Sequence, residues 1–222
     1  MAASTAMQSI GKENLPGLFE ALRNVFTAQR EALIALDGKV GDSDLGITMN
    51  KAFVAAYDSV HQNANDPIGK TLQLAGMAVA KSAPSTMGTL VATGLMRGGK
   101  ALDGAQTLST AEMSVFWSAF LKGVADRGKA QLGDKTLLDV LSPIAQSLQA
   151  SSANSTDLPD ALAQAAQAAR DGLEATKAMV AQHGKAACFQ EKTVGLQDAG
   201  ATVGVLIIET MHAYVMQSRS NK

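Results

Sequence analysis

Apolar residues recur at helical spacing along most of the chain. The first run starts after Asn14, which is suited to cap a helix, has Pro16 in its first turn, and ends near Asp37. A second run passes through Met49, Phe53 and Tyr57 and stops in the polar turn at residues 63–67. Further runs cover residues 68–80, 87–102, 110–127, 136–149, 158–182 and 200–217. The pattern predicts eight helices and therefore an all-α bundle or barrel.

Composition supports this fold class. Aromatic residues make up only 4% of the 222 residues, while alanine, leucine and methionine are abundant, which favours close-packed helices over strands. We expect one domain over residues 1–222, because the one low-complexity stretch, residues 150–157, has the length of an ordinary helix connection. Residues 1–13 precede the first helical run and are candidates for a disordered N-terminus.

Charge and cysteine content limit the classes of partner. The 19 basic residues nearly balance the 20 acidic ones, so we expect neither a nucleic acid nor an anionic membrane as a partner. No signal peptide is recognised, and no stretch approaches the ~20 apolar residues of a membrane span. The single cysteine, Cys188, fits a reducing compartment, and a cytoplasmic location is expected.

Three aspartates gather in the loop after the first predicted helix. Asp37, Asp42 and Asp44 lie within eight residues, among glycines that allow the chain to fold them together. Carboxylates held at contact distance repel one another and raise one another's pKa, a cost that a hard divalent cation such as Mg²⁺ removes. The alternative, favoured by this loop alone, is that the aspartates only cap helices and form turns.

Three further loops combine glycine with hydroxyl or charged side chains. Residues 81–89 place Ser85 and Thr86 at the start of a helix, where unpaired N–H groups can receive phosphate, although either residue could be an ordinary cap. Residues 127–136 and 184–201 pair glycines with charges, as solvated loops often do. Each loop by itself is weak evidence for a binding site.

Together the loops resemble one family in order and spacing. The segments are LDGKVGDSDLGITMN (residues 36–50), RGKAQLGDKTLLD (residues 127–139) and GKAACFQEKTVGLQDAGA (residues 184–201). They are similar to the characteristic stretches of the nucleotide-binding (ADP-binding) subunits of dihydroxyacetone kinases, and the GDKT stretch with its flanking RGKA is the most specific. The resemblance covers nearly the whole chain.

The resemblance implies an eight-helix antiparallel barrel that holds ADP or ATP and two Mg²⁺ ions at one rim. Asp37, Asp42 and Asp44 take the positions of the metal ligands. The implied nucleotide-binding residues are Leu45, Gly46, Ile47, Thr48, Ser85, Thr86, Gly128, Leu137, Lys185, Lys192, Asp198, Ala199 and Gly200. Leu45 stands where family members have histidine, Lys185 and Lys192 replace arginines, and Ala199 replaces a proline. These departures indicate a divergent subgroup.

The implied activity is that of a kinase subunit that works by positioning and electrostatics, so no catalytic residue is assigned. The ketose would be held by a separate dihydroxyacetone-kinase-type substrate-binding subunit. A phosphotransferase-system phosphoryl donor, direct use of ATP and a homodimer all remain open. So do erythrulose or another acceptor, and a regulatory role on a transcription regulator. His61, His183 and His212 are interpreted as surface or helix-end residues outside the motif loops.

Overall fold

The computed structural model describes residues 6–217, which fold almost entirely into helices. The α-helices in this part of the chain are α1 Leu15–Ala28, α2 Arg30–Asp37, α3 Leu45–Gln62, α4 Ile68–Ser82, α5 Thr86–Ala101, α6 Thr110–Gly128, α7 Leu138–Ala153, α8 Leu158–Ala175 and α9 Ala199–Gln217. Short 3₁₀ helices are η1 Lys12–Asn14, η2 Thr176–Ala178 and η3 Ala186–Thr193. The all-α class is confirmed.

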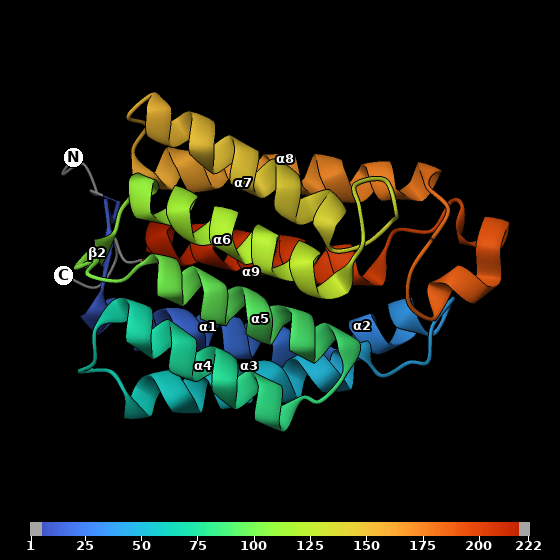
Figure 1. Cartoon of the computed structure of the whole chain (residues 1–222), viewed down its shortest axis with the longest axis horizontal. Coiled ribbons are helices and arrows are strands. Elements are labelled where there is room, and N and C mark those ends of the chain that lie inside the picture. Colours follow the sequence, from blue (N-terminus) through green and yellow to red (C-terminus); the bar gives the residue numbers. More distant parts are fainter. Residues whose placement is uncertain (1–5, 218–222) are drawn as a thin grey trace.

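Eight of these helices form a closed antiparallel ring (Figure 1). α1 packs on α3, each helix from α3 to α9 packs on the next, and α9 closes on α1. α2 lies outside the ring, at the end of the barrel where the segment between α8 and α9 projects (Figure 1). The first predicted helix is therefore two helices, because the chain turns at Gln29 (φ −86°, ψ 2°). The turn lets α2 pack on the start of α3, where a side chain at Gly46 would collide with the Arg30 carbonyl.

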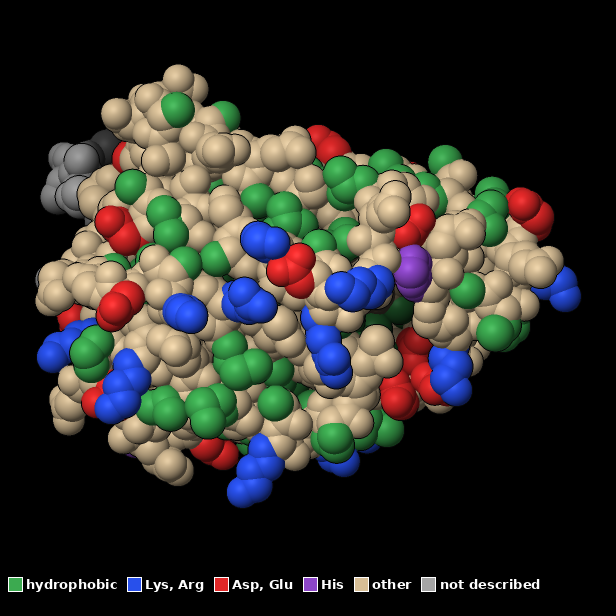
Figure 2. Space-filling model, viewed as in Figure 1, with side chains coloured by type: hydrophobic (Ala, Val, Ile, Leu, Met, Phe, Trp, Pro, Cys, Tyr) green, Lys and Arg blue, Asp and Glu red, His purple; other side chains and the backbone are tan. Residues whose placement is uncertain are grey.

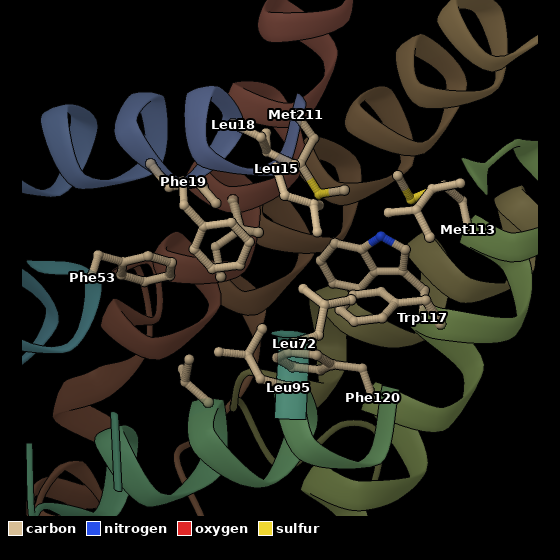
Figure 3. A pocket seen from close by; sticks show the side chains of 15 residues that line it. Leu15, Leu18, Phe19, Phe53, Leu72, Leu95, Met113, Trp117, Phe120 and Met211 are labelled. Atoms are coloured by element: carbon tan, nitrogen blue, oxygen red, sulfur yellow. The ribbon is translucent and has the colours of Figure 1, made fainter. Parts of the chain in front are cut away.

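The barrel interior is apolar and nearly filled. Leu15, Leu18 and Phe19 of α1 face Trp117 and Phe120 of α6 across it (Figure 3). Only a small cavity of about 40 Å³ remains between them. Nearly all buried hydrophobic residues of the described chain form one continuous cluster, which gives the barrel a single core.

Two boundary predictions need correction. Within residues 1–13, the part from Ala6 onward is placed, and residues 1–5 lie outside the described residues. The buried Ile10 belongs to β1 (Ile10–Gly11), which pairs antiparallel with β2 (Thr107–Leu108) at the barrel end opposite α2 (Figure 1). The helix predicted over residues 158–182 ends as an α-helix at Ala175, since the chain beyond it bonds to the loop before α7 instead of continuing the helical ladder.

α9 corrects the expectation that no stretch approaches a membrane span. By length and composition it is apolar enough to cross a membrane, although half of it is buried within the barrel. It packs against α1, α7 and α8. The apolar sequence of α9 is thus that of a core helix covered by neighbours on more than one side.

Candidate functional site

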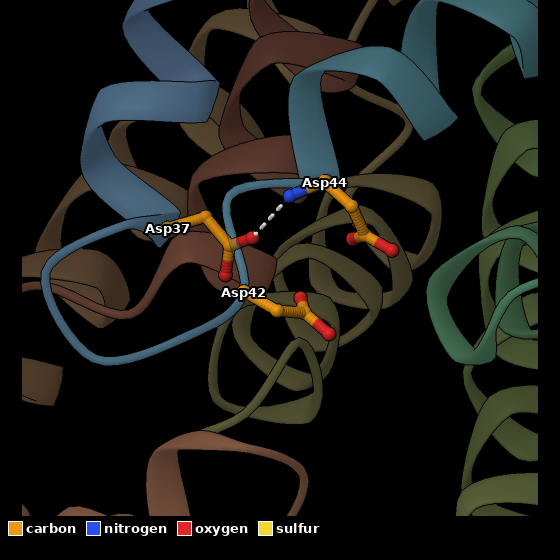
Figure 4. Close-up of side chains that lie close together, drawn as sticks. All are labelled: Asp37, Asp42 and Asp44. Carbon is orange, nitrogen blue, oxygen red and sulfur yellow. Dashed lines mark hydrogen bonds between the residues drawn. The ribbon is translucent and has the colours of Figure 1, made fainter.

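The acidic loop between α2 and α3 folds around the Asp37 carboxylate. Asp37 is the final residue of α2, and its Oδ2 accepts a hydrogen bond from the backbone N–H of Asp44 at 3.0 Å (Figure 4). The same oxygen accepts from the backbone N–H of Leu45 at 3.3 Å. Ser43 adopts a left-handed conformation (φ 61°) to complete the turn. A side chain at Gly41 would collide with the Asp37 carboxylate, so glycine is needed there. The capping interpretation is therefore correct for one oxygen of Asp37.

The same loop brings three carboxylates together. Asp37, Asp42 and Asp44 each offer an oxygen within 4.8 Å of the others. Burial raises the pKa of Asp44, and the charges of Asp42 and Asp37 raise it further, while Lys185 acts in the opposite direction. Lys185 Nζ lies 3.4 Å from Asp42 Oδ2 and is the one cation paired with the cluster in the described chain. Such an all-oxygen donor set fits Mg²⁺.

A cavity of about 220 Å³ opens beside these aspartates. Its wall includes the first residues of three helices: Leu45 of α3, Thr86 of α5 and Ala199 of α9. Helix N-termini carry unpaired N–H groups and a partial positive charge, so their convergence favours an anion such as phosphate. Acidic and basic side chains lie side by side at this end of the surface, next to a hollow (Figure 2).

Ser85 begins α5 as an N-cap. Its Oγ accepts a hydrogen bond from the Gly88 N–H at 3.0 Å. A side chain at Gly88 would collide with the Ala83 carbonyl, so the preceding loop passes close over the first turn of α5. The capping alternative is confirmed for Ser85, and the capped turn lines the cavity through Ser85, Thr86 and Met87.

The GDKT segment (residues 133–136) reaches the cavity through Lys135. Asp139 of α7 accepts from the N–H groups of Gly133 (2.6 Å) and Thr136 (2.7 Å) and so closes the loop on itself. Lys135 is buried, with 3% exposure, lines the cavity, and donates to main-chain carbonyls of the segment between α8 and α9. Burial lowers the pKa of Lys135, whereas the charge of Asp198 raises it.

Asp198 caps α9 and lines the same cavity. Its Oδ2 accepts from the Ala201 N–H at 2.6 Å. Burial raises the pKa of Asp198 to about 6, and this rise is opposed by the Ala201 N–H and then by Lys135. Asp198 therefore changes its charge close to neutral pH.

His183 is a surface residue, as the sequence predicts, but it also belongs to the site. Its side chain is 38% exposed and lines the cavity, and its Nε2 lies 2.9 Å from Asp134 Oδ2 of the GDKT segment. Asp134 also accepts from the Gln131 N–H at 2.6 Å, which fixes its carboxylate. The sequence offered a signal only in the position of His183 directly before Gly184 and Lys185.

Comparison with known proteins shows the family of this chain. The model of the DAK2 domain matches residues 39–213, which is most of the chain. The chain belongs to the DAK2 domain family. It is 32% identical to the PEP-dependent dihydroxyacetone kinase, ADP-binding subunit DhaL, of Escherichia coli over 85% of this chain and 90% of that protein. It is 29% identical to the L-erythrulose kinase of Pectobacterium atrosepticum over 95% of this chain but only 36% of that protein.

A solved structure shares the fold of this DAK2 domain. The dihydroxyacetone kinase of C. freundii in complex with AMP-PNP and Mg²⁺ superposes with a TM-score of 0.69 at 24% identity. The match covers 96% of this chain and 36% of that one. The predicted family and barrel fold are confirmed by these comparisons.

The DAK2 domain brings most, but not all, of the predicted site residues to one cavity. Those that line it are Asp37, Asp42, Asp44, Leu45, Ser85, Thr86, Lys185, Asp198, Ala199 and Gly200. Gly128 lies in an adjoining hollow that shares Ser85 and Thr86. Gly46, Ile47, Thr48, Leu137 and Lys192 line neither: Leu137 is buried beneath α9, and Lys192 is exposed on η3. Lys135 and His183 are additions that the sequence did not predict.

Proposed function

We propose that this chain is the nucleotide-binding subunit of a dihydroxyacetone-kinase-type enzyme, holding ADP or ATP through Mg²⁺. The main support for this proposal is that a carboxylate cluster and three helix N-termini line one cavity. The helix ends attract phosphate and the carboxylates repel it, so both can contact a nucleotide only with a cation between them. The name of the Escherichia coli relative and the ligands of the C. freundii structure support the proposal.

Each part of the site has a chemical task in this proposal. Asp37, Asp42 and Asp44 hold Mg²⁺, which neutralises charge on the phosphate oxygens. The first turns of α3, α5 and α9 and the Lys185 ammonium bind the remaining oxygens. Transfer then proceeds by positioning and electrostatic stabilisation, because phosphoryl transfer requires little covalent chemistry from the protein.

The acceptor is proposed to be a short ketose held by a separate substrate-binding subunit. Dihydroxyacetone is favoured by the relative that matches over most of its length. Erythrulose is the alternative, since the chain also matches about a third of erythrulose kinases from two organisms. The donor is either ATP that exchanges or a phosphotransferase-system protein that rephosphorylates bound ADP.

Titration calorimetry with ADP tests the nucleotide site. We expect binding that requires Mg²⁺ and that is sharply weakened by Asp42→Asn or Asp44→Asn. Asp126→Asn is the matched control, because Asp126 pairs only with Lys122 on the surface of α6. Equal affinity with and without Mg²⁺, in wild type and all variants, would refute the site.

A coupled kinase assay tests the division of labour. The isolated chain should phosphorylate no free ketose, whereas addition of the substrate-binding subunit should restore transfer that depends on the aspartates. Holding an acceptor in line with the phosphate lowers the activation barrier by roughly 7–11 kcal/mol. The rim is already occupied by nucleotide and metal, so it does not hold a freely diffusing sugar in that way. Aspartate-dependent turnover of dihydroxyacetone by the chain alone would contradict the proposal.

A further inference from the structure

The Lys135 ammonium group is enclosed by four backbone carbonyls. Its Nζ lies 2.7 Å from the carbonyl oxygen of Thr176, 3.2 Å from that of Met179, 2.8 Å from that of Thr193 and 2.6 Å from that of Leu196. The acceptors all belong to the segment between α8 and α9, although Lys135 itself precedes α7. A single side chain thus gathers the two ends of that segment around one point.

Only a charged ammonium suits this arrangement, because it has three N–H donors and a neutral amine has two. Hydrogen bonds from a charged donor are about twice as strong as neutral ones. The segment needs such support, since residues 176–198 contain only 3₁₀ turns, and most of η3 is exposed. Gln190 within η3 has a non-helical backbone (φ 49°, ψ −127°), so no regular helical ladder runs through η3.

The loop before α7 anchors the same segment at two further points. The Gln182 N–H donates to the Asp134 carbonyl at 3.0 Å, and the Asp134 carboxylate contacts His183. The segment carries His183, Lys185 and Asp198, which form one wall of the phosphate cavity. The position of that wall therefore depends on the GDKT segment.

We propose that Lys135 is a positioning residue for the nucleotide: it fixes the segment between α8 and α9 so that His183, Lys185 and Asp198 face the phosphates. The inference rests on the proposed nucleotide-binding function and adds a residue and a mechanism to it. A purely structural role in the barrel is disfavoured by the geometry, because all four carbonyls belong to residues outside the α-helices, with Thr176 directly following α8. Loss of Lys135 should loosen the segment and leave the ring of helices closed.

The test compares Lys135→Met with Lys177→Met. Lys177 lies in the same segment but forms only a surface ion pair with Glu174 at 2.7 Å, so it is a matched control. We expect Lys135→Met to weaken binding of ADP with Mg²⁺ by about tenfold or more, while helical circular dichroism stays unchanged. Hydrogen exchange should show lost amide protection between residues 176 and 198 and retained protection in α3 to α7. Lys177→Met should match wild type in every measurement.

Chemical rescue separates positioning from general destabilisation. Lys135→Ala leaves space for the missing part of the side chain, so propylammonium should restore affinity for ADP with Mg²⁺. Tetramethylammonium carries the same charge without N–H donors and should not restore it. Rescue by both ions, or by neither, would overturn the assignment of Lys135 as a hydrogen-bonding clamp.

The outcomes distinguish this inference from the proposed function. A wild-type chain that does not bind ADP with Mg²⁺ overturns the function and the nucleotide role of Lys135 together. Normal wild-type binding with unchanged affinity and exchange in Lys135→Met overturns the inference alone. If Lys135→Met does not fold, native-state exchange of the wild type decides: opening of residues 176–198 below the free energy of global unfolding supports the inference, and opening only with the whole barrel refutes it.

Discussion

Replacing Asp198 with asparagine should stabilise the nucleotide-free protein at neutral pH. Burial raises the pKa of the Asp198 carboxyl from 3.8 to about 6, so the folded state binds a proton more tightly than the unfolded state. Asp198 therefore contributes its full stability below pH 3.8, and that contribution is lost as the pH rises through about 6. An asparagine has no charge to bury and can still accept from the Ala201 N–H, so the cap on α9 is kept.

The size of the effect follows from the shift. A difference of about two pKa units corresponds to roughly 3 kcal/mol between the charged and neutral forms at pH 7. In a protein of this length, 1 kcal/mol moves the Tm by about 2–4 °C, so Asp198→Asn should raise the Tm by about 6–12 °C at pH 7. The gain should shrink steadily as the pH falls from 6 toward 4.

Urea denaturation at pH 7 and pH 4, without nucleotide or Mg²⁺, measures this difference directly. Asp126→Asn is the control, because Asp126 is exposed on α6 and its replacement should change stability by less than about 0.5 kcal/mol at either pH. Two results would contradict this reasoning: an Asp198→Asn variant that is no more stable than wild type at pH 7, or a gain in stability that does not depend on pH. Either result would show that the buried Asp198 charge does not destabilise the folded state.

Three further changes test the local structure by thermal and urea denaturation. Ser85→Ala should cost about 1 kcal/mol, since it removes the cap from the Gly88 N–H, and an unchanged midpoint would contradict the cap. Gly76→Val should cost about 1–3 kcal/mol, because its Cβ would lie 2.8 Å from the Ala92 carbonyl oxygen between α4 and α5, and an unchanged midpoint would contradict that close approach. Asp139→Ala should cost about 2 kcal/mol or more by leaving two loop N–H groups unpaired, and a neutral result would refute that role.

The helices were predictable because their apolar positions repeat along the sequence. The periodic pattern located the helices of the ring, and it failed only where the chain turns without losing that pattern, at Gln29 and after Ala175. The acidic loop was predictable for a different reason. Asp37, Asp42 and Asp44 are close in sequence, so a single glycine-containing turn is sufficient to bring them together.

The rest of the site depends on contacts that the sequence does not mark. The partners of Lys135 are main-chain carbonyls, which every residue has, so no residue type pointed to them. His183 lines the cavity beside Asp134, which contacts its ring from a loop 49 residues earlier in the chain. The resemblance predicts Leu137 at the nucleotide. In the structure its apolar side chain packs under α9, and Gly200 rather than Leu137 lines the cavity.

The closure of the ring between α1 and α9 has a consequence for biosynthesis. The other ring contacts join helices that are neighbours along the chain, so they can form as soon as each helix leaves the ribosome. The side of α1 that packs on α9 is different, because α9 is separated from α1 along the chain by the remaining ring helices. Until α9 is made, the nascent barrel exposes an apolar slot and lacks the helix end that completes the cavity. We therefore expect that, during translation, docking of α9 completes the ligand site and at the same time buries the apolar surface that chaperones would recognise.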